Sequence, residues 1–319
     1  MKEPIKLRTI FMGTSGFAAE ILKSLLLANY NIISVYTRSD KKTGRKQEIQ
    51  KTEVKTAAEE KNIPIYDPEK LDSETIAEIR AQKPDLIIVA AYGKILPEEI
   101  LNLPGFGCVN VHASLLPKYR GPSPIQNAIL RGEEETGTTI MLMDEGIDTG
   151  SILSRRKTAV EPNETCAQLY RKLSALSSSL LLETIPLWIE RKITPEAQND
   201  AEAILCELIE KNDGKIMWTD SAEDIYNRYR AFYPWPGIFT YFESGKFNFR
   251  LKLNKIVIMD DDQKTRHHLG EVIAFEEKIG VQTGRGTIIL EEVQLEGKSN
   301  VKISDFLNGY PEFVGSILK

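Results

Sequence analysis

Cysteine is scarce in this sequence: its 319 residues include three, Cys108, Cys166 and Cys206, and no C-x-x-C pair. An odd number of widely spaced cysteines argues against a disulfide framework and against a zinc site. Long apolar runs are lacking too, since no stretch approaches the roughly 18 residues typical of a membrane span. Residues 1–6 show no apolar run followed by a small-residue cleavage site, so we expect no secretion signal. We therefore expect a reduced, cytoplasmic setting and no membrane partner.

A surplus of positive charge is also absent. The net charge of −5 argues against a nucleic-acid partner, because such proteins usually present a basic surface. The exception lies between Arg38 and Lys55, where basic residues outnumber acidic ones: Lys41, Lys42, Arg45, Lys46 and Lys51 against Asp40, Glu48 and Glu53. Taken alone, such a run is typical of a solvated surface loop. It indicates a nucleic-acid site only if other parts of the chain give independent evidence for one.

The first half of the chain alternates short β-rich runs with amphipathic helices. This pattern predicts an α/β fold, a Rossmann-like, doubly wound sheet covered by helices. With 41% hydrophobic and 27% charged residues, the chain has an ordinary globular composition and the length of about two domains. We expect strands at residues 7–12, 32–36, 85–91, 107–112, 138–143 and 151–153, and helices at about 17–26 and 164–189.

The second half has a different periodicity. The helical pattern lapses at Ile193–Asp200, a connection that contains proline and glutamate and that we interpret as a linker. Beyond it, Phe247–Leu253 alternates apolar and polar residues, as an antiparallel strand with one buried face does. A hairpin turn at Glu243–Lys246 precedes this strand, and a short helix is expected near 221–232. Further β-like runs with glycine-containing turns predict a small C-terminal β-barrel of the oligonucleotide-binding (OB) type.

These patterns predict three regions. They are a catalytic domain at 1–191, a linker at 192–204 and the C-terminal barrel domain at 205–319.

Polar side chains at one strand end are the first candidates for chemistry. Asn110 and His112 share a face of the expected strand, because side chains alternate along a strand. Open α/β sheets bind ligands beyond the carboxyl ends of their strands, where an amide and an imidazole are useful together. Cys108 lies on the same face without a second cysteine, so we interpret it as a buried apolar residue. Gly13–Gly16 lacks the third glycine of a dinucleotide-binding motif and is explained by the need for small residues at a strand-to-helix turn.

A glycine-bounded loop, Met143–Gly150, carries carboxylates between two expected strands. A carboxylate beside a histidine can hold its tautomer, favour its charged form and accept a proton. Acidic residues are common in turns, so this loop is only suggestive by itself.

Together these segments resemble the folate-dependent formyltransferases. Asn110–Pro117, continued by Arg120-Gly121 and Pro124–Gln126, is similar to one signature of that family, and Gly137–Ile140 followed by Asp144–Gly150 is similar to the second. The two stand in the right order and at the right separation. The family includes enzymes that act on initiator tRNA, glycinamide ribonucleotide, amino sugars and formyl-folate itself.

Three segments narrow the resemblance to the members that formylate charged initiator tRNA. Phe11–Ala18 resembles their first strand and loop, although Ser15 and Gly16 stand where proline and aspartate are more usual. Arg38–Lys46 resembles the insertion that engages the acceptor arm, but Lys46 follows Arg45 where a second glycine is common. Arg230–Gly237 resembles the entry into their C-terminal barrel. Of these three segments, the insertion at Arg38–Lys46 best distinguishes the enzymes that act on initiator tRNA from the other members of the family.

The resemblance implies a set of site residues. Asn110 and protonated His112 would stabilise an oxyanion, and Asp148 would support His112 and receive the amine proton. Ser114, Leu115, Leu116 and Pro117 would contact 10-formyltetrahydrofolate, a co-substrate, with no metal required. Arg45, Lys41, Lys42 and Lys46, with the C-terminal domain, would bind initiator methionyl-tRNA for translation initiation.

We expect a monomer. A sugar-nucleotide N-formyltransferase on the same scaffold is the alternative enzyme. A non-catalytic nucleic-acid-binding protein is the alternative of another class, against which the intact Asn110, His112 and Asp148 set argues.

Overall fold

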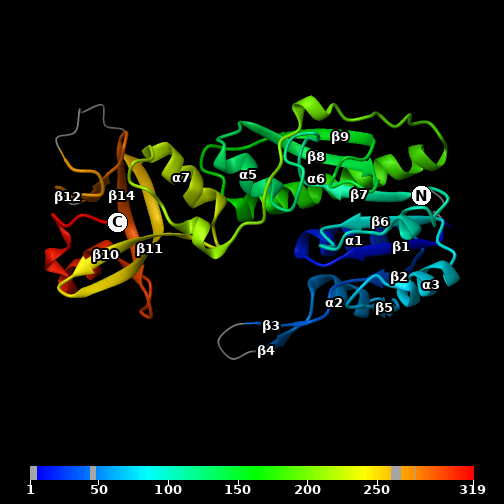
Figure 1. Ribbon diagram of the computed structural model, residues 1–319, viewed down its shortest axis with the longest axis horizontal. Coiled ribbons are helices and arrows are strands. Elements are labelled where there is room, and N and C mark those ends of the chain that lie inside the picture. The colour runs from blue at the N-terminus through cyan, green and yellow to red at the C-terminus, as the bar shows by residue number, and fades with distance from the viewer. Residues whose placement is uncertain (1–5, 44–47, 260–266, 277) are drawn as a thin grey trace. The chain divides into compact units, whose positions relative to one another are not determined.

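The structure is a computed structural model that describes residues 6–43, 48–259, 267–276 and 278–319 (Figure 1). The chain forms two compact units, each assembled from segments that are separated in sequence. Unit 1 comprises Met1–Pro124, Glu135–Ala159 and Gln168–Leu208, and unit 2 comprises Ile125–Glu134, Val160–Ala167 and Ile209–Lys319. Two short segments from the first half therefore pack with the C-terminal part. The domain boundaries at 191 and 204 stay a prediction.

Unit 1 is built on a seven-stranded sheet in the order β5-β2-β1-β6-β7-β8-β9. Five strands are parallel: β1 (Thr9–Gly13), β2 (Ile32–Tyr36), β5 (Ile65–Tyr66), β6 (Leu86–Ala90) and β7 (Cys108–His112). The last two, β8 (Glu135–Leu142) and β9 (Ile152–Ala159), continue the sheet in antiparallel pairing. The crossovers place β1 at the centre of the parallel part, so the predicted doubly wound α/β class is confirmed.

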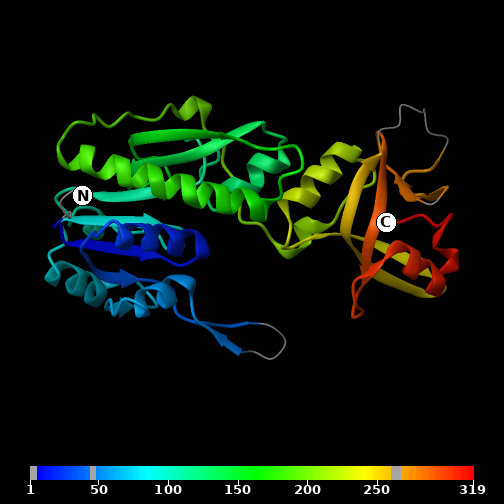
Figure 2. The same ribbon diagram turned by 180° about the vertical axis from the view of Figure 1, so that it is seen from behind.

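Helices cover both faces of this sheet (Figure 2). They are α1 (Gly16–Leu27), α2 (Glu53–Glu59), α3 (Ser73–Ala81), α4 (Glu98–Leu101) and α6 (Cys166–Ile189), while α5 (Pro124–Leu130) follows the β7 loop. On one face, Ile10 and Met12 of β1 pack in one cluster with Ile79 of α3 and Ile100 of α4. On the other, α1 meets α6 where the Phe17 and Tyr170 rings pack edge-on at 5.8 Å. Burial on both faces explains why β6 is continuously apolar.

Two elements differ from the expected ones. Strand β9 extends to Ala159, well beyond the predicted end at residue 153. The prediction stopped early because the later residues of β9 alternate between half-buried and exposed positions and do not form an apolar run. Arg155, Arg156 and Lys157 therefore conceal it from a search for apolar runs. The basic segment forms a hairpin of β3 (Lys41–Thr43) and β4 (Glu48–Gln50), in which Lys41 pairs with Gln50.

Unit 2 contains an antiparallel sheet that curls into a half-barrel in the order β10-β11-β14-β13-β12, with β15 paired to β14. Its strands are β10 (Ile238–Ser244), β11 (Phe247–Met259), β12 (Val272–Phe275), β13 (Lys278–Gln282), β14 (Thr287–Leu295) and β15 (Val301–Lys302). Helices α7 (Ala222–Ala231) and α8 (Ile303–Gly309) belong to this unit, as does α5 except for its first residue. The predicted β10–β11 hairpin is confirmed, since Ser244 pairs with Phe247 across Gly245 at φ 60°.

An aromatic cluster fixes α8 against this sheet. Phe242 of β10 packs edge-on against Phe306 and Phe313, with ring centroids 6.2 and 5.0 Å apart. Phe242 is fully buried. Edge-to-face geometry suits the quadrupoles of aromatic rings, so the cluster stabilises more than its buried area alone.

Candidate active site

The candidate site begins at the carboxyl end of β7, where Asn110 and His112 point to the same side as predicted. Both are nearly buried, with 8% and 6% of their surfaces exposed. β7 is the strand at which the sheet changes direction, parallel to β6 and antiparallel to β8. Asn110 and His112 lie in the half of β7 toward its carboxyl end, and ligands of open α/β sheets bind outside the carboxyl ends of the strands.

Asp148 joins these two residues from the loop between β8 and β9. One carboxylate oxygen, Oδ1, accepts a hydrogen bond from Asn110 Nδ2 at 3.2 Å. The other, Oδ2, accepts from the Gly121 backbone N–H at 2.8 Å and lies 3.5 Å from His112 Nδ1. The structure therefore brings together all three residues that the family resemblance implied as catalytic, although their roles stay a prediction.

The partners of His112 determine its tautomer. Nε2 lies 2.9 Å from the Tyr119 carbonyl oxygen, which can only accept, so Nε2 carries a proton. In the neutral ring, Nδ1 would then direct a lone pair at the Asp148 carboxylate. In the protonated ring, Nδ1 directs an N–H at it instead. The Nδ1–Oδ2 distance of 3.5 Å is longer than a charge-assisted hydrogen bond of about 2.7–2.9 Å, so the geometry is compatible with either form of the ring.

The loop predicted to contact folate is fixed to β8. Thr139 Oγ1 donates to the Ser114 carbonyl at 2.7 Å and accepts from the Leu116 N–H at 3.1 Å. The Ser114 hydroxyl donates to the Lys118 carbonyl at 2.6 Å. Ser114, Leu116 and Pro117 are buried, and Leu115 alone among the four is partly exposed. If this loop binds a ligand, Leu115 is the side chain that reaches it.

The basic residues predicted to bind tRNA lie only partly within the described structure. Lys41 and Lys42 belong to β3, and Arg45 and Lys46 lie outside the described residues. Just beyond the hairpin, Lys55 Nζ lies 3.0 Å from both Asp40 and Asp67. The hydrogen bonds that Lys55 donates to these carboxylates raise its pKa. This ion-paired cluster anchors the hairpin to the body of unit 1.

None of the three cysteines was predicted to be catalytic, and Cys206 Sγ lies 3.1 Å from the Arg120 carbonyl oxygen and 3.6 Å from that of Tyr119. All are buried thiols, and burial raises the pKa of Cys108 to about 12. Cys108 lies in the same apolar cluster as Ile10 and Ile100, as its interpretation as an apolar residue predicts.

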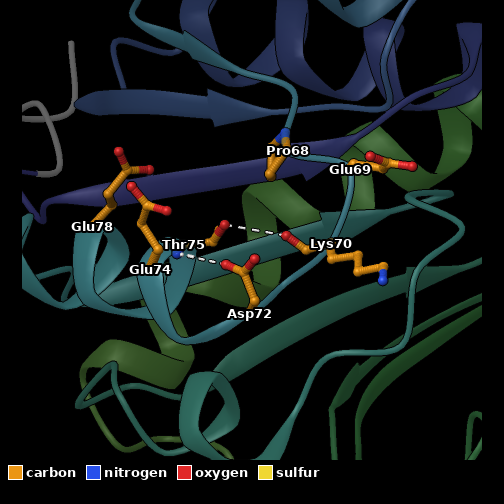
Figure 3. Close-up of a pocket in the computed structure, with 7 residues that line it drawn as sticks. All are labelled: Pro68, Glu69, Lys70, Asp72, Glu74, Thr75 and Glu78. Carbon is orange, nitrogen blue, oxygen red and sulfur yellow. Dashed lines mark hydrogen bonds between the residues drawn. The ribbon is translucent and has the colours of Figure 1, made fainter.

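A pocket of about 280 Å³ lies elsewhere in unit 1 (Figure 3). Its lining residues are Pro68, Glu69, Lys70, Asp72, Glu74, Thr75 and Glu78. Asp72 caps α3 by accepting a hydrogen bond from the Thr75 N–H at 3.1 Å, which lowers the pKa of the Asp72 carboxyl. Carboxylates at the first turn of a helix stabilise it. Asp72 and Thr75 in this lining therefore serve to cap α3, and the lining includes none of the candidate site residues.

Within the described ranges, no three histidine, cysteine or acidic side chains come together in a way that could hold a metal ion. Among the helices of the described part of the chain, none is both long and apolar enough to cross a bilayer.

Two polar residues of the site were not singled out from the sequence. Arg120 appeared only as part of a signature, yet the residue is 5% exposed and its guanidinium is paired with Asp200 at 2.8 Å. Gln198 fell in the presumed linker, yet its side chain contacts the Asp148 loop. For Arg120, the available signal in the sequence was its position next to a glycine of the signature, Gly121. No local pattern marked the second.

Comparison with known proteins agrees with this geometry. Residues 6–185 match the family described as formyl transferase, and residues 208–311 match the formyl transferase C-terminal domain. The chain belongs to the formyl transferase family.

Relatives at full length carry a more specific name. The chain is 41% identical over 315 residues to a methionyl-tRNA formyltransferase of Caldanaerobacter subterraneus, covering 98% of this chain and 100% of the relative. It is 42% identical to the protein of the same name from Caldicellulosiruptor saccharolyticus, covering 97% and 99%.

Solved structures share the fold at lower identity. HypX from Aquifex aeolicus in complex with tetrahydrofolic acid aligns with a TM-score of 0.64 and 17% identity, over 97% of this chain and 48% of that one. An N-formyltransferase from Helicobacter canadensis, in complex with folinic acid and dTDP-3-aminofucose, aligns with a TM-score of 0.63 and 21% identity, over 89% and 98%.

Proposed function

We propose that this enzyme transfers the formyl group of 10-formyltetrahydrofolate to the amino group of initiator methionyl-tRNA, for translation initiation. The observation that carries the proposal is the convergence of Asn110, His112 and Asp148 at the carboxyl end of β7. The full-length relatives supply the acceptor, because they are named for methionyl-tRNA. Sugar formyltransferases resemble this chain only at the level of fold.

The chemistry asks for hydrogen-bond donors and a proton acceptor. Attack of a neutral amine on the formyl carbon builds negative charge on the formyl oxygen. When this oxyanion collapses, the bond from the formyl carbon to the folate nitrogen breaks, and that nitrogen leaves with a proton that balances the one lost by the amine. Asn110 Nδ2 carries two N–H groups, of which Asp148 takes one, so the other can face an oxyanion. The loss of such a preorganised donor typically costs about 2.7–4 kcal/mol in the transition state.

His112 can contribute only after an exchange of partners. Its Nε2–H donates to the Tyr119 carbonyl, and its Nδ1 faces Asp148. The oxyanion would therefore replace Tyr119 as the acceptor at Nε2, while Asp148 balances the charge of the ring. Asp148 would also receive the amine proton, directly or through a water molecule.

The folate is consumed in each turnover and is a co-substrate. Its formyl carbon is already activated, so the transfer requires neither a metal nor a covalent intermediate. We assign its contact to Ser114–Pro117, where a buried, hydrogen-bonded loop presents Leu115 at the surface. A fixed apolar surface of this kind suits a planar ring system.

We assign the tRNA to the β3–β4 hairpin, through Lys41, Lys42, Arg45 and Lys46, and to the C-terminal barrel domain. A hairpin stiffened by β pairing and anchored at Lys55 can present basic side chains to phosphates without a basic protein overall. We further propose that the enzyme acts as a monomer in the cytoplasm.

One assay tests the proposal against its alternatives. The protein is incubated with 10-formyltetrahydrofolate and either charged initiator methionyl-tRNA or an amino-sugar nucleotide, and formylated product is measured. We expect formylation of the tRNA alone. Formylation of the sugar nucleotide alone would establish the alternative enzyme, and tRNA binding without formylation of either acceptor would indicate a non-catalytic binding protein.

A further inference from the structure

We propose that Gln198 is a positioning residue for Asp148. The Gln198 side chain binds the backbone of the loop that carries Asp148, and the buried Arg120 fixes the orientation of the Gln198 side chain. The inference rests on the proposed function of Asp148. It concerns a residue that the sequence pattern places in a linker, far from the signature segments.

The Gln198 side chain uses its full hydrogen-bonding capacity in this link. Nε2 donates to the carbonyls of Asp148 and Gly150, each at 2.8 Å. Oε1 accepts from Arg120 Nε at 3.0 Å and from Arg120 Nη2 at 2.9 Å. A primary amide has two N–H groups and two lone pairs on oxygen, so all four are engaged. Turning the amide over would oppose its oxygen to two carbonyls and its NH₂ group to a guanidinium, which fixes its orientation.

Asp148 needs an external support. Its φ of 54° lies in the left-handed region, which costs about 1–3 kcal/mol for a residue other than glycine. Residues 144–147 of the same loop are exposed, so the loop itself offers little packing. Such a conformation persists only where the surroundings determine it. The two bonds from Gln198 hold the loop backbone, and the Asp148 carboxylate then meets Gly121 and Asn110.

Arg120 connects this support to the other side of the site. Its backbone N–H donates to the Ile204 carbonyl at 2.9 Å, and its carbonyl accepts from the Cys206 N–H at 2.8 Å. Gly121 follows at φ 112°, and a Cβ there would lie 2.4 Å from the Cys206 carbonyl oxygen. The segment 198–206 is thus bonded to Arg120 beside the N–H that binds Asp148. Gln198 therefore binds both sides of the Asp148–Gly121 contact: the Asp148 backbone directly, and Gly121 through the neighbouring Arg120.

A positioning role for Gln198 and a role in fold stability alone lead to different expectations. If Gln198 acts through Asp148, its loss lowers turnover, while the binding of both substrates changes little. Its effect also disappears once Asp148 is disabled, because residues that act as one unit are not additive. A residue that only stabilises the fold lowers the melting temperature and acts independently of Asp148.

The experiment uses the full-length enzyme with two substitutions. Gln198→Met removes all four hydrogen bonds at nearly constant volume. Gln198→Glu keeps an acceptor for Arg120 but removes both donors to the loop, so it separates the two halves of the link. Glu202→Gln is the matched control, an exposed residue of the same segment whose carboxylate accepts from Asn199. Each is measured alone, and Gln198→Met is also combined with Asp148→Asn.

We expect both Gln198 variants to lose about 10- to 100-fold in kcat, the range that small misplacements of catalytic groups produce. The KM values for formyl-folate and charged tRNA should change by less than about threefold, and the control should resemble wild type. Adding Gln198→Met to Asp148→Asn should lower kcat by less than about threefold further. Multiplying effects in the double variant, unchanged kcat in Gln198→Glu, or loss of the folded state in both variants would overturn the inference. Full activity of Asp148→Asn would instead refute the proposed role of Asp148 itself.

Discussion

Replacing Asp148 with asparagine keeps the shape of the side chain and removes its charge. The native carboxylate accepts from Asn110 Nδ2 at 3.2 Å and from the Gly121 N–H at 2.8 Å, and it faces His112 Nδ1 at 3.5 Å. Asparagine has a single accepting oxygen, so its NH₂ group faces a donor whichever way the amide turns. A hydrogen bond to a charged group contributes about 1.5–3 kcal/mol, which converts to a loss of about 10- to 150-fold in turnover.

The same substitution tests whether His112 needs a negative charge beside it, because it removes the carboxylate that faces Nδ1 at 3.5 Å. The measurement is steady-state formylation of charged tRNA at saturating folate. Glu145→Gln, at an exposed carboxylate of the same loop, is the matched control and should resemble wild type. Unchanged turnover would show that Asp148 is only a turn residue.

Three further predictions concern the rest of the site and the thiols. Asn110→Ala and His112→Ala should each lower turnover by about 100- to 1,000-fold with the melting temperature and tRNA binding nearly intact, and near-normal turnover in both would remove the oxyanion site. Arg45→Ala should raise the KM for charged tRNA much more than that for folate and lower the log–log salt slope of tRNA binding by about one unit or less. Unaltered tRNA kinetics and salt dependence would make the hairpin a solvated surface turn. Burial raises the pKa of Cys108 and Cys166 to about 12, so these thiols should react with a disulfide reagent at neutral pH only after unfolding. Rapid labelling of either one in the native enzyme would contradict their burial.

Much of the architecture could be predicted from local pattern. The strand β6 is apolar along its whole length because both faces of a parallel sheet are covered, and such a run is visible in any sequence. Asn110 and His112 were recognisable because alternation along a strand puts them on one face at a strand end. The hairpin turn before Phe247 was visible because a glycine-containing turn precedes a run of alternating residues. Each of these signals lies within a few residues of the feature it predicts.

Only the tertiary structure decided how distant segments meet. Asp148 reaches Asn110 across 38 residues; the family resemblance pointed to Asp148 among the acids of its loop, but no spacing rule predicted the contact itself. Strand β9 continues through Arg155 because its neighbour β8 supplies the pairing, while its own polar residues carry no strand signal. Gln198 lies 50 residues from Asp148 and 78 from Arg120, in a segment without periodicity. Local sequence specifies elements through short-range preference and burial, but a side-chain amide acquires its role only when the folded chain places carbonyls and a guanidinium around it.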